Sequence, residues 1–136
     1  MDSMVISIVN EFIAAINEGN ASRLSSLMSK DHIFIDSQGT KDCGRDKMRK
    51  GWEEYFRMFP DYRVEIQDIL QDGNVVAVFG SASGTYSGKR GLVPENRIEM
   101  PAAWKAVVDN GKVKFWQVYA DWTEGWKIIN EDTEKG

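Results

Sequence analysis

The hydrophobic residues of the first 60 positions follow the spacing of helices. Between residues 3 and 18 apolar side chains recur every three or four positions, and Gly19 then suits the left-handed turn that ends a helix. A second, short helix is expected around Leu24 and Leu27. The same spacing over residues 46–59 carries an aromatic stripe and stops at a proline, so three helices are predicted in this part of the chain.

From residue 62 onward the pattern changes to long runs that suit paired strands. The predicted strands span residues 62–71, 75–86, 97–108 and 112–122. Asp-Gly and Asn-Gly pairs at residues 72–74 and 109–111 favour a hairpin turn within each pair of strands. A shorter strand is expected earlier, at residues 32–36, before a polar loop over residues 37–44.

Helices followed by an antiparallel sheet predict an α+β fold in one domain, residues 1–136. Gly80 and Gly84 permit strong curvature, so the sheet is expected to wrap around the helices as a cone with a pocket on its concave side. The loop at residues 87–96 is either a lid for that pocket or a plain connector. Residues 126–136 are increasingly charged and are expected to form a loosely ordered tail.

The composition excludes several classes of function. A net charge of −4 argues against nucleic-acid binding, which needs clustered basic residues. Cys43 and His32 are the single cysteine and histidine, so no internal disulfide and no metal site is expected. His32 is expected to be half-buried or on the surface. Without a basic leader or an apolar run near the ~18 residues of a membrane span, the chain is expected to be cytoplasmic, with no membrane partner.

Two aspartates carry the candidate chemistry, because each closes an apolar, strand-like run. Asp36 ends the short first strand, and Asp121 lies at the end of the last strand among several aromatic residues. A carboxylate that faces an aromatic pocket has a raised pKa and becomes a usable general acid or base. Tyr55 or Tyr119 would be its hydrogen-bonding partner. The alternative for Asp121 is a surface or turn-capping role.

The helix stripe and the strand alternation converge on one expected pocket. Its ligand-binding residues would be Phe12, Trp52, Phe56, Phe79 and Trp104. Alternation in the last strand places Tyr119 and Asp121 on the pocket side. The outer side would carry Trp116, Val118 and Trp122. Because both sides are apolar, the outer face of the sheet is expected to form a homodimer, although a bulge would swap the two faces.

Several stretches carry a family signal: residues 58–70, 73–78 and 83–88, and residues 109–113 leading to Tyr119-Ala120-Asp121. On these residues the chain resembles the SnoaL-like branch of the nuclear transport factor 2-like (NTF2-like) superfamily. The resemblance implies a cone-shaped, cystatin-like fold, with three N-terminal helices on a strongly curved, mainly antiparallel sheet. The superfamily includes isomerases, cyclases, dehydratases, epoxide hydrolases and ligand-binding or scaffold modules, so the fold alone does not name the reaction.

Within this resemblance, Asp36 matches the catalytic base of ketosteroid isomerases. The two oxyanion donors of the isomerases fall here on Phe12 and near Ala103 or Trp104, which do not replace them closely. Asp121 matches the acid/base aspartate of SnoaL-type polyketide cyclases, whose partner histidine is absent here. The epoxide hydrolases place an arginine between two carboxylates, and this chain has no such arginine.

The expected function is a domain that binds a small apolar molecule in a deep pocket and acts as a cofactor-free lyase or isomerase of the aldol-cyclase type. An aspartate would be its general acid or base. The alternatives are a binding module without turnover and a dimerisation module whose cavity is filled. An open cavity that contains a carboxylate would favour the enzyme.

Overall fold

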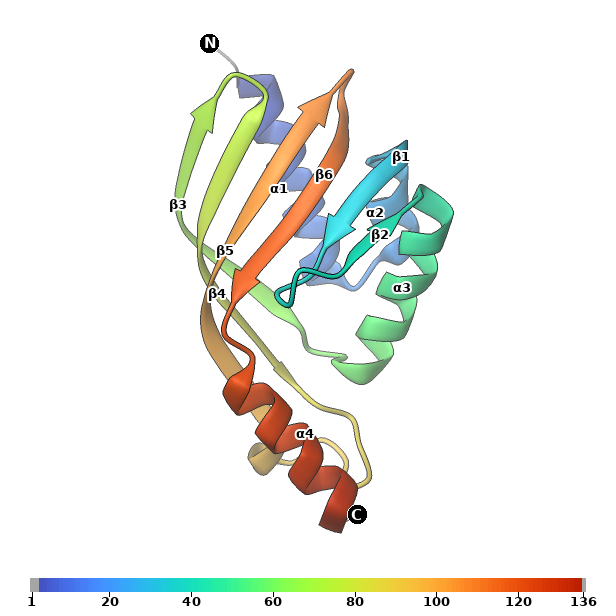
Figure 1. Ribbon diagram of the computed structural model, residues 1–136, viewed down its shortest axis with the longest axis vertical. Coiled ribbons are helices and arrows are strands. Elements are labelled where there is room, and N and C mark those ends of the chain that lie inside the picture. Colours follow the sequence, from blue (N-terminus) through green and yellow to red (C-terminus); the bar gives the residue numbers. More distant parts are fainter. Residues whose placement is uncertain (1–2, 136) are drawn as a thin grey trace.

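The computed structural model describes residues 3–135, in which α1, α2 and α3 lie on one side of a six-stranded sheet (Figure 1). The helices are α1 (Ser3–Glu18), α2 (Ala21–Ser26), α3 (Arg45–Met58) and α4 (Thr123–Lys135), with a short 3-10 helix, η1 (Pro94–Asn96). The strands are β1 (Met28–Ile35), β2 (Lys41–Cys43), β3 (Arg63–Asp72), β4 (Val75–Thr85), β5 (Arg97–Asp109) and β6 (Lys112–Ala120). This order confirms the predicted α+β fold, with α4 as an additional helix. None of the helices in this part of the chain is both long and apolar enough to cross a membrane.

The sheet is mixed and follows the order β2-β1-β6-β5-β4-β3. Neighbouring strands are antiparallel except β1 and β6, which run parallel. Pairing with β6 lets β1 begin at Met28, earlier than the predicted start at His32. The predicted polar loop contains β2, which pairs with the end of β1. Its three largely polar residues have no strand pattern of their own, so only the pairing reveals it.

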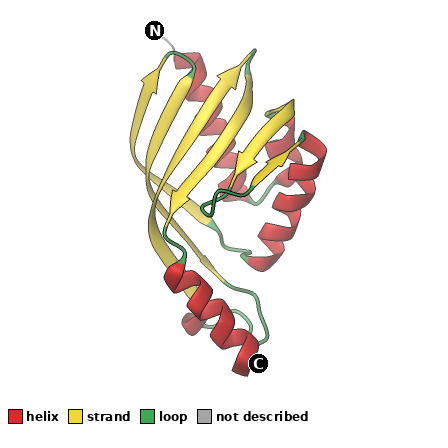
Figure 2. Ribbon diagram, viewed as in Figure 1, coloured by secondary structure: helices red, strands yellow, loops and turns green. Residues whose placement is uncertain are grey.

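Both predicted hairpin turns are present, and backbone conformations explain them. Gly73 has a φ of 62°, and Asn110 and Gly111 have φ values of 51° and 75°, in the left-handed region that such turns require. Gly80 is required for a steric reason, because a Cβ there would overlap the backbone carbonyl oxygen of Glu65. The pairing of β3 with β4 shifts register beside this contact, which forms a bulge in the curved sheet (Figure 2).

The core lies between α1 and the concave face of the sheet. Phe12 of α1 is buried against Trp116 of β6, with ring centroids 4.7 Å apart, and Trp104 of β5 stacks on the same indole. The prediction that Trp116 faces outward is therefore wrong. β6 places one extra residue opposite β5, between Val113 and Phe115, at a register shift. Because both faces of β6 are apolar, alternation in the sequence did not distinguish them.

Residues 123–135 form α4, where a loosely ordered tail was predicted from residue 126 onward. The charges of this segment conceal an apolar face. Ile128 and Ile129 pack against a buried cluster formed by Phe59, Ile98 and Met100. The prediction of a loose tail is wrong because these tertiary contacts hold the segment as a helix. Residue 136 of the predicted tail lies outside the described residues.

Candidate functional site

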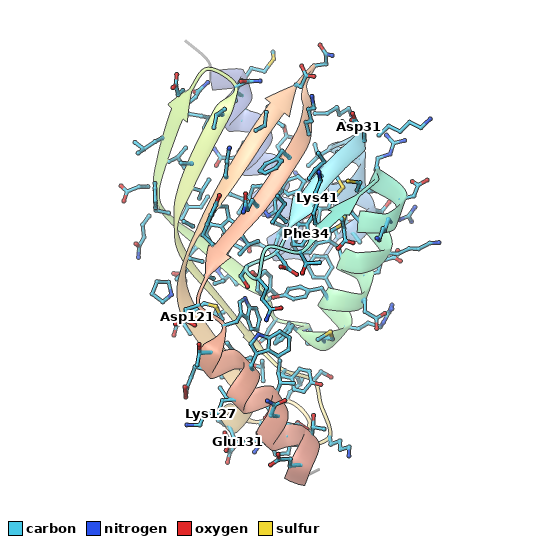
Figure 3. All side chains as sticks on the ribbon, in the orientation of Figure 1. Asp31, Phe34, Lys41, Asp121, Lys127 and Glu131 are labelled. Atoms are coloured by element: carbon cyan, nitrogen blue, oxygen red, sulfur yellow. The ribbon has the colours of Figure 1, made fainter. Side chains whose placement is uncertain are left out.

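A pocket of about 380 Å³ lies between α3, the end of β1 and the start of α4. Its aromatic lining residues are Phe34, Trp52, Tyr55, Phe59, Tyr62, Trp122 and Trp126. Its charged lining residues are Asp36, Asp42 and Lys47. Figure 3 shows Phe34 on β1, beside α3, at the level of this pocket. The pocket thus combines a mostly aromatic wall with a few charged groups.

The aromatic side chains form a continuous band. Trp52 meets Tyr55 at 83° with ring centroids 5.7 Å apart, and Tyr55 meets Tyr62 at 83° and 4.9 Å. Phe59 meets Trp122 at 64° and 5.9 Å. Rings at such steep angles pack edge to face, so the band follows the pocket wall without forming one flat stack.

Tyr55 and Tyr62 supply hydroxyl groups to this pocket. Burial raises the pKa of Tyr55 well above its ordinary value, and the neighbouring Tyr62 raises it further. Burial also raises the pKa of Tyr62, to about 12. Both phenols therefore stay protonated at physiological pH. Tyr55 donates its proton to Tyr62, so the pair has the Tyr62 hydroxyl left to donate to an oxygen of a bound molecule.

Asp36 follows β1 and brings a carboxylate to the pocket. Its Oδ1 accepts hydrogen bonds from the backbone N–H groups of Gln38 and Thr40, each at 2.9 Å. These bonds fix the carboxylate on a tight turn, while Oδ2 has no hydrogen-bond partner among residues 4–134. The second acid, Asp42, is paired with Lys47 at 2.8 Å on the exposed rim. Asp36 is therefore the lining acid that is available to a ligand.

Trp52 contributes its ring to the pocket lining. Its side chain is 6% exposed, and its indole Nε1 is enclosed by the protein without a hydrogen-bond partner in the described part of the chain, so this N–H is not exposed to the pocket.

Asp36, Tyr55 and Trp52 are the predicted site residues that line this pocket. Three others, Phe12, Trp104 and Phe56, do not line it, which corrects their predicted role. Phe12 and Trp104 are buried against Trp116, which fills the space between α1 and β5. Phe56 packs on Trp52, with centroids 5.5 Å apart, and supports the wall from behind.

The predicted pocket positions of Asp121, Tyr119 and Phe79 are wrong. Asp121 is exposed at the junction of β6 and α4 (Figure 3), where its Oδ1 accepts hydrogen bonds from the backbone N–H and the hydroxyl of Thr123. The bond from the Thr123 hydroxyl, and after it the bond from the backbone N–H, lower the pKa of Asp121. A general acid needs the opposite, a raised pKa. Tyr119 and Phe79, at 51% and 42% exposure, occupy the outer face of the sheet in register with Ala103.

Sequence reasoning missed Tyr62, Trp122, Trp126 and Ile129 as lining residues. Trp126 and Ile129 are three positions apart, which is the spacing of one helix face, so a signal existed in the segment that was treated as a tail. Trp122 reaches the pocket once the faces of β6 are assigned correctly. Tyr62 follows the proline after α3, and no pattern in the sequence marked it.

His32 is fully buried on β1, so the prediction of a half-buried or surface position is wrong. Its Nδ1 lies 2.7 Å from the carbonyl oxygen of Val113, so Nδ1 carries the proton and donates it. Burial lowers the pKa of His32, although the bond to Val113 opposes this shift. The residue is not among those that line the pocket, and it belongs to the core.

The pocket can therefore offer one proton acceptor and a neutral donor inside apolar walls. A carboxylate can take a proton from a bound molecule and return it elsewhere, while the donor holds an oxygen on which negative charge develops. Over residues 3–135, no three His, Cys, Asp or Glu side chains come together as a metal site.

The model of the SnoaL-like domain family matches residues 9–116 of this chain. The chain therefore belongs to the SnoaL-like family, as its resemblance predicted. No functionally curated protein matches the chain.

Several solved structures share the NTF2-like, ketosteroid isomerase-like fold. A hypothetical protein with this fold from Catenulispora acidiphila, in complex with trimethylamine, is 21% identical with a TM-score of 0.72, over 82% of this chain and 83% of the other. A protein assigned as a SnoaL-like polyketide cyclase from Jannaschia sp. is 15% identical with a TM-score of 0.80, over 93% and 92%. An epoxide hydrolase from M. tuberculosis is 15% identical with a TM-score of 0.78, over 96% and 92%. At these identities the likeness concerns the fold alone.

Proposed function

We propose that this domain binds a small, largely apolar molecule in the aromatic pocket and acts on it as a cofactor-free lyase or isomerase of the aldol-cyclase type. Asp36 is the general acid/base, and the hydrogen-bonded pair Tyr55 and Tyr62 donates to an oxygen of the bound molecule. The observation that carries the proposal is one carboxylate with a free oxygen in the same aromatic pocket as two protonated phenols.

The proposed chemistry is proton transfer at a carbon next to a carbonyl group. The Asp36 carboxylate accepts the proton, and the tyrosine pair donates a hydrogen bond to the oxygen that gains negative charge, an arrangement that lowers the barrier by stabilising the enolate. Return of the proton to another carbon completes an isomerisation. In a ring closure, the enolate carbon attacks a second carbonyl in the same molecule, whose π electrons move to its oxygen, and Asp36 returns the proton to that oxygen.

The pocket also suits this proposal in size and surroundings. Its volume of about 380 Å³ falls within the range of roughly 300–1,000 Å³ that is usual for small-molecule sites. Its mostly aromatic lining lowers the local polarity, which strengthens the hydrogen bonds to a developing charge. An open pocket of this kind does not fit a module whose cavity is filled by side chains.

A second candidate is a binding module without turnover. The observation in its favour is the pair of backbone N–H groups that already bind Oδ1 of Asp36, because these bonds hold the carboxylate in one orientation. Both candidates use the same pocket and differ only in whether Asp36 moves a proton.

The test is a screen for ligands followed by variants of Asp36. Trp52, Trp122 and Trp126 line the pocket, so tryptophan fluorescence reports occupancy directly. For any compound that is turned over, Asp36→Asn is expected to lower kcat by about 10²- to 10⁴-fold, because the amide keeps the shape of the side chain and cannot accept the proton.

Asp121→Asn is the matched control, because an exposed asparagine still accepts a hydrogen bond at the start of α4. This variant is expected to retain the wild-type rate. Wild-type turnover in Asp36→Asn would refute the general-base role and leave the binding module. A rate loss in Asp121→Asn without one in Asp36→Asn would refute the assignment of Asp36 as the general acid/base.

A further inference from the structure

We infer that the ligand of the aromatic pocket is an organic cation: a molecule with an ammonium group, an apolar body and an oxygen function. This inference rests on the proposed function, because it assigns the chemical class of the molecule that the same pocket binds. Three properties of the lining carry it: the arrangement of the rings, the balance of charge and the hydrogen-bond donor.

Aromatic rings make up much of the pocket lining. Seven of the seventeen lining residues are aromatic, and neighbouring rings meet at 83° for Trp52 and Tyr55 and at 64° for Phe59 and Trp122. Pairs at such steep angles pack edge to face, so the planes of the lining rings differ in direction. The negative face of an aromatic ring attracts an ammonium group within about 6 Å of its centroid, and tryptophan is the strongest partner.

The lining carries an excess of negative charge. Its charged residues are two acids and one base, and the base, Lys47, forms an ion pair with Asp42 at 2.8 Å. No Lys, Arg or His of residues 4–134 forms an ion pair with Asp36. Tyr55 and Tyr62 stay neutral. The pocket therefore has one carboxylate without a counter-ion, which attracts a cation, is indifferent to a neutral molecule and repels an anion.

The hydrogen-bond donor defines the rest of the ligand. Tyr55 donates its proton to Tyr62, which leaves the hydroxyl of Tyr62 as a neutral donor on the pocket lining, and an ammonium group supplies no acceptor for it. The ligand therefore also carries an oxygen, such as a carbonyl or hydroxyl group. A positive charge near a carbonyl makes the neighbouring C–H groups more acidic, so this class is compatible with Asp36 as the proton acceptor.

The experiment compares three probes of nearly equal shape that differ in charge: 3-hydroxyphenyltrimethylammonium, 3-tert-butylphenol and 3-hydroxybenzenesulfonate. Their dissociation constants for the wild-type protein are measured by tryptophan fluorescence and by calorimetry. The ammonium compound is expected to bind at least about tenfold more tightly than the tert-butyl compound, and the sulfonate more weakly than either.

Variants then locate the charge effect. Asp36→Asn is expected to reduce the preference for the ammonium compound about fivefold or more, with little change for the tert-butyl compound. Asp31→Asn, an exposed acid on β1 outside the pocket, is the matched control and should keep the full preference. An equal preference in Asp36→Asn and wild type would overturn the inference, because the cation would then be bound elsewhere on this acidic protein.

The outcomes also separate this inference from the proposed function. If the tert-butyl compound binds as tightly as the ammonium compound, the cation inference fails while the pocket remains a site for apolar molecules. If neither compound changes the fluorescence or releases heat, while the protein is folded, both the inference and the proposed pocket fail.

Discussion

His32 is a neutral histidine enclosed in the core, which makes the stability of the protein depend on pH. Burial lowers its pKa from the ordinary value of 6.5, so the folded protein binds the proton less readily than the unfolded chain does. The stabilisation is fully present above about pH 6.5 and is lost as pH falls through the lowered pKa of the folded state. Each unit of that shift corresponds to about 1.4 kcal/mol.

We expect the free energy of unfolding to fall between about pH 7.5 and about pH 5, and to fall less in His32→Leu, which has no proton to gain. Urea unfolding at several pH values measures both slopes. Carboxylates titrate alike in the two proteins and cancel in the comparison. Equal slopes in this range would show that His32 does not control the pH dependence.

At the scale of elements, α4 is held in place by a buried carboxylate. Asp132 is 1% exposed and accepts hydrogen bonds from the backbone N–H groups of Lys89 at 2.7 Å and Arg90 at 3.2 Å. It also accepts one from the side-chain amide of Asn96, at 2.9 Å. The loop between β4 and β5 thus anchors α4, the helix that brings Trp126 to the pocket.

Replacement of Asp132 by alanine is expected to loosen α4 without unfolding the sheet, because three donors lose their acceptor. Amide hydrogen exchange should become faster in residues 123–135 while β4 and β5 stay protected, and ligand affinity should fall. Glu134→Ala, on an exposed position of the same helix, is the control and should leave exchange unchanged. Unaltered protection of α4 in Asp132→Ala would contradict the anchoring role.

Replacement by alanine should change the free energy of unfolding in opposite directions at two glycines in different elements. A Cβ at Gly80 overlaps the backbone of Glu65 at the bulge, so Gly80→Ala is expected to destabilise the protein by about 1–3 kcal/mol. Gly51 lies within α3, where a Cβ has room, with Met48 Cε 3.9 Å away. Gly51→Ala is expected to stabilise by about 1 kcal/mol through helix propensity. Urea unfolding measures both, and changes of the same sign would refute the argument.

For the whole molecule, the outer face of the sheet is the surface that we expect to form a homodimer. All the helices that cover the sheet lie on its other side (Figure 2). Phe79, Ala103 and Tyr119 lie side by side across β4, β5 and β6 on this outer face, with the two aromatic side chains exposed. Such a contiguous apolar surface is typical of an interaction site.

We expect the protein to be a dimer by light scattering, and Tyr119→Arg and Phe79→Arg to shift it toward the monomer, because each buries a charge in the interface. Leu92→Arg, on an exposed position between β4 and β5, is the control and should remain dimeric. A monomeric wild-type mass at micromolar concentration would rule this interface out.

The sequence by itself determined the features that depend on short-range spacing. The periodicity of α1 and α3 and the Asp-Gly and Asn-Gly turns express preferences of residues a few positions apart, and the structure contains each of them. The family signal depends on such stretches too, and it is confirmed over residues 9–116. The sequence likewise predicted the position of Asp36 at the end of a strand, and Asp36 lines the pocket.

The tertiary structure alone decided which side chains meet. One extra residue in β6 opposite β5 turned Trp122 toward the pocket and Tyr119 away from it, and left Asp121 as a cap for α4. The order of α4 depends on bonds between Asp132 and Arg90, which are 42 positions apart. When both faces of a strand are apolar, alternation in the sequence does not show which face is buried. The sequence of a charged segment likewise does not show which distant residue it contacts. The site therefore combines one aspartate that the sequence marked with aromatic walls that only the packing of distant segments assembled.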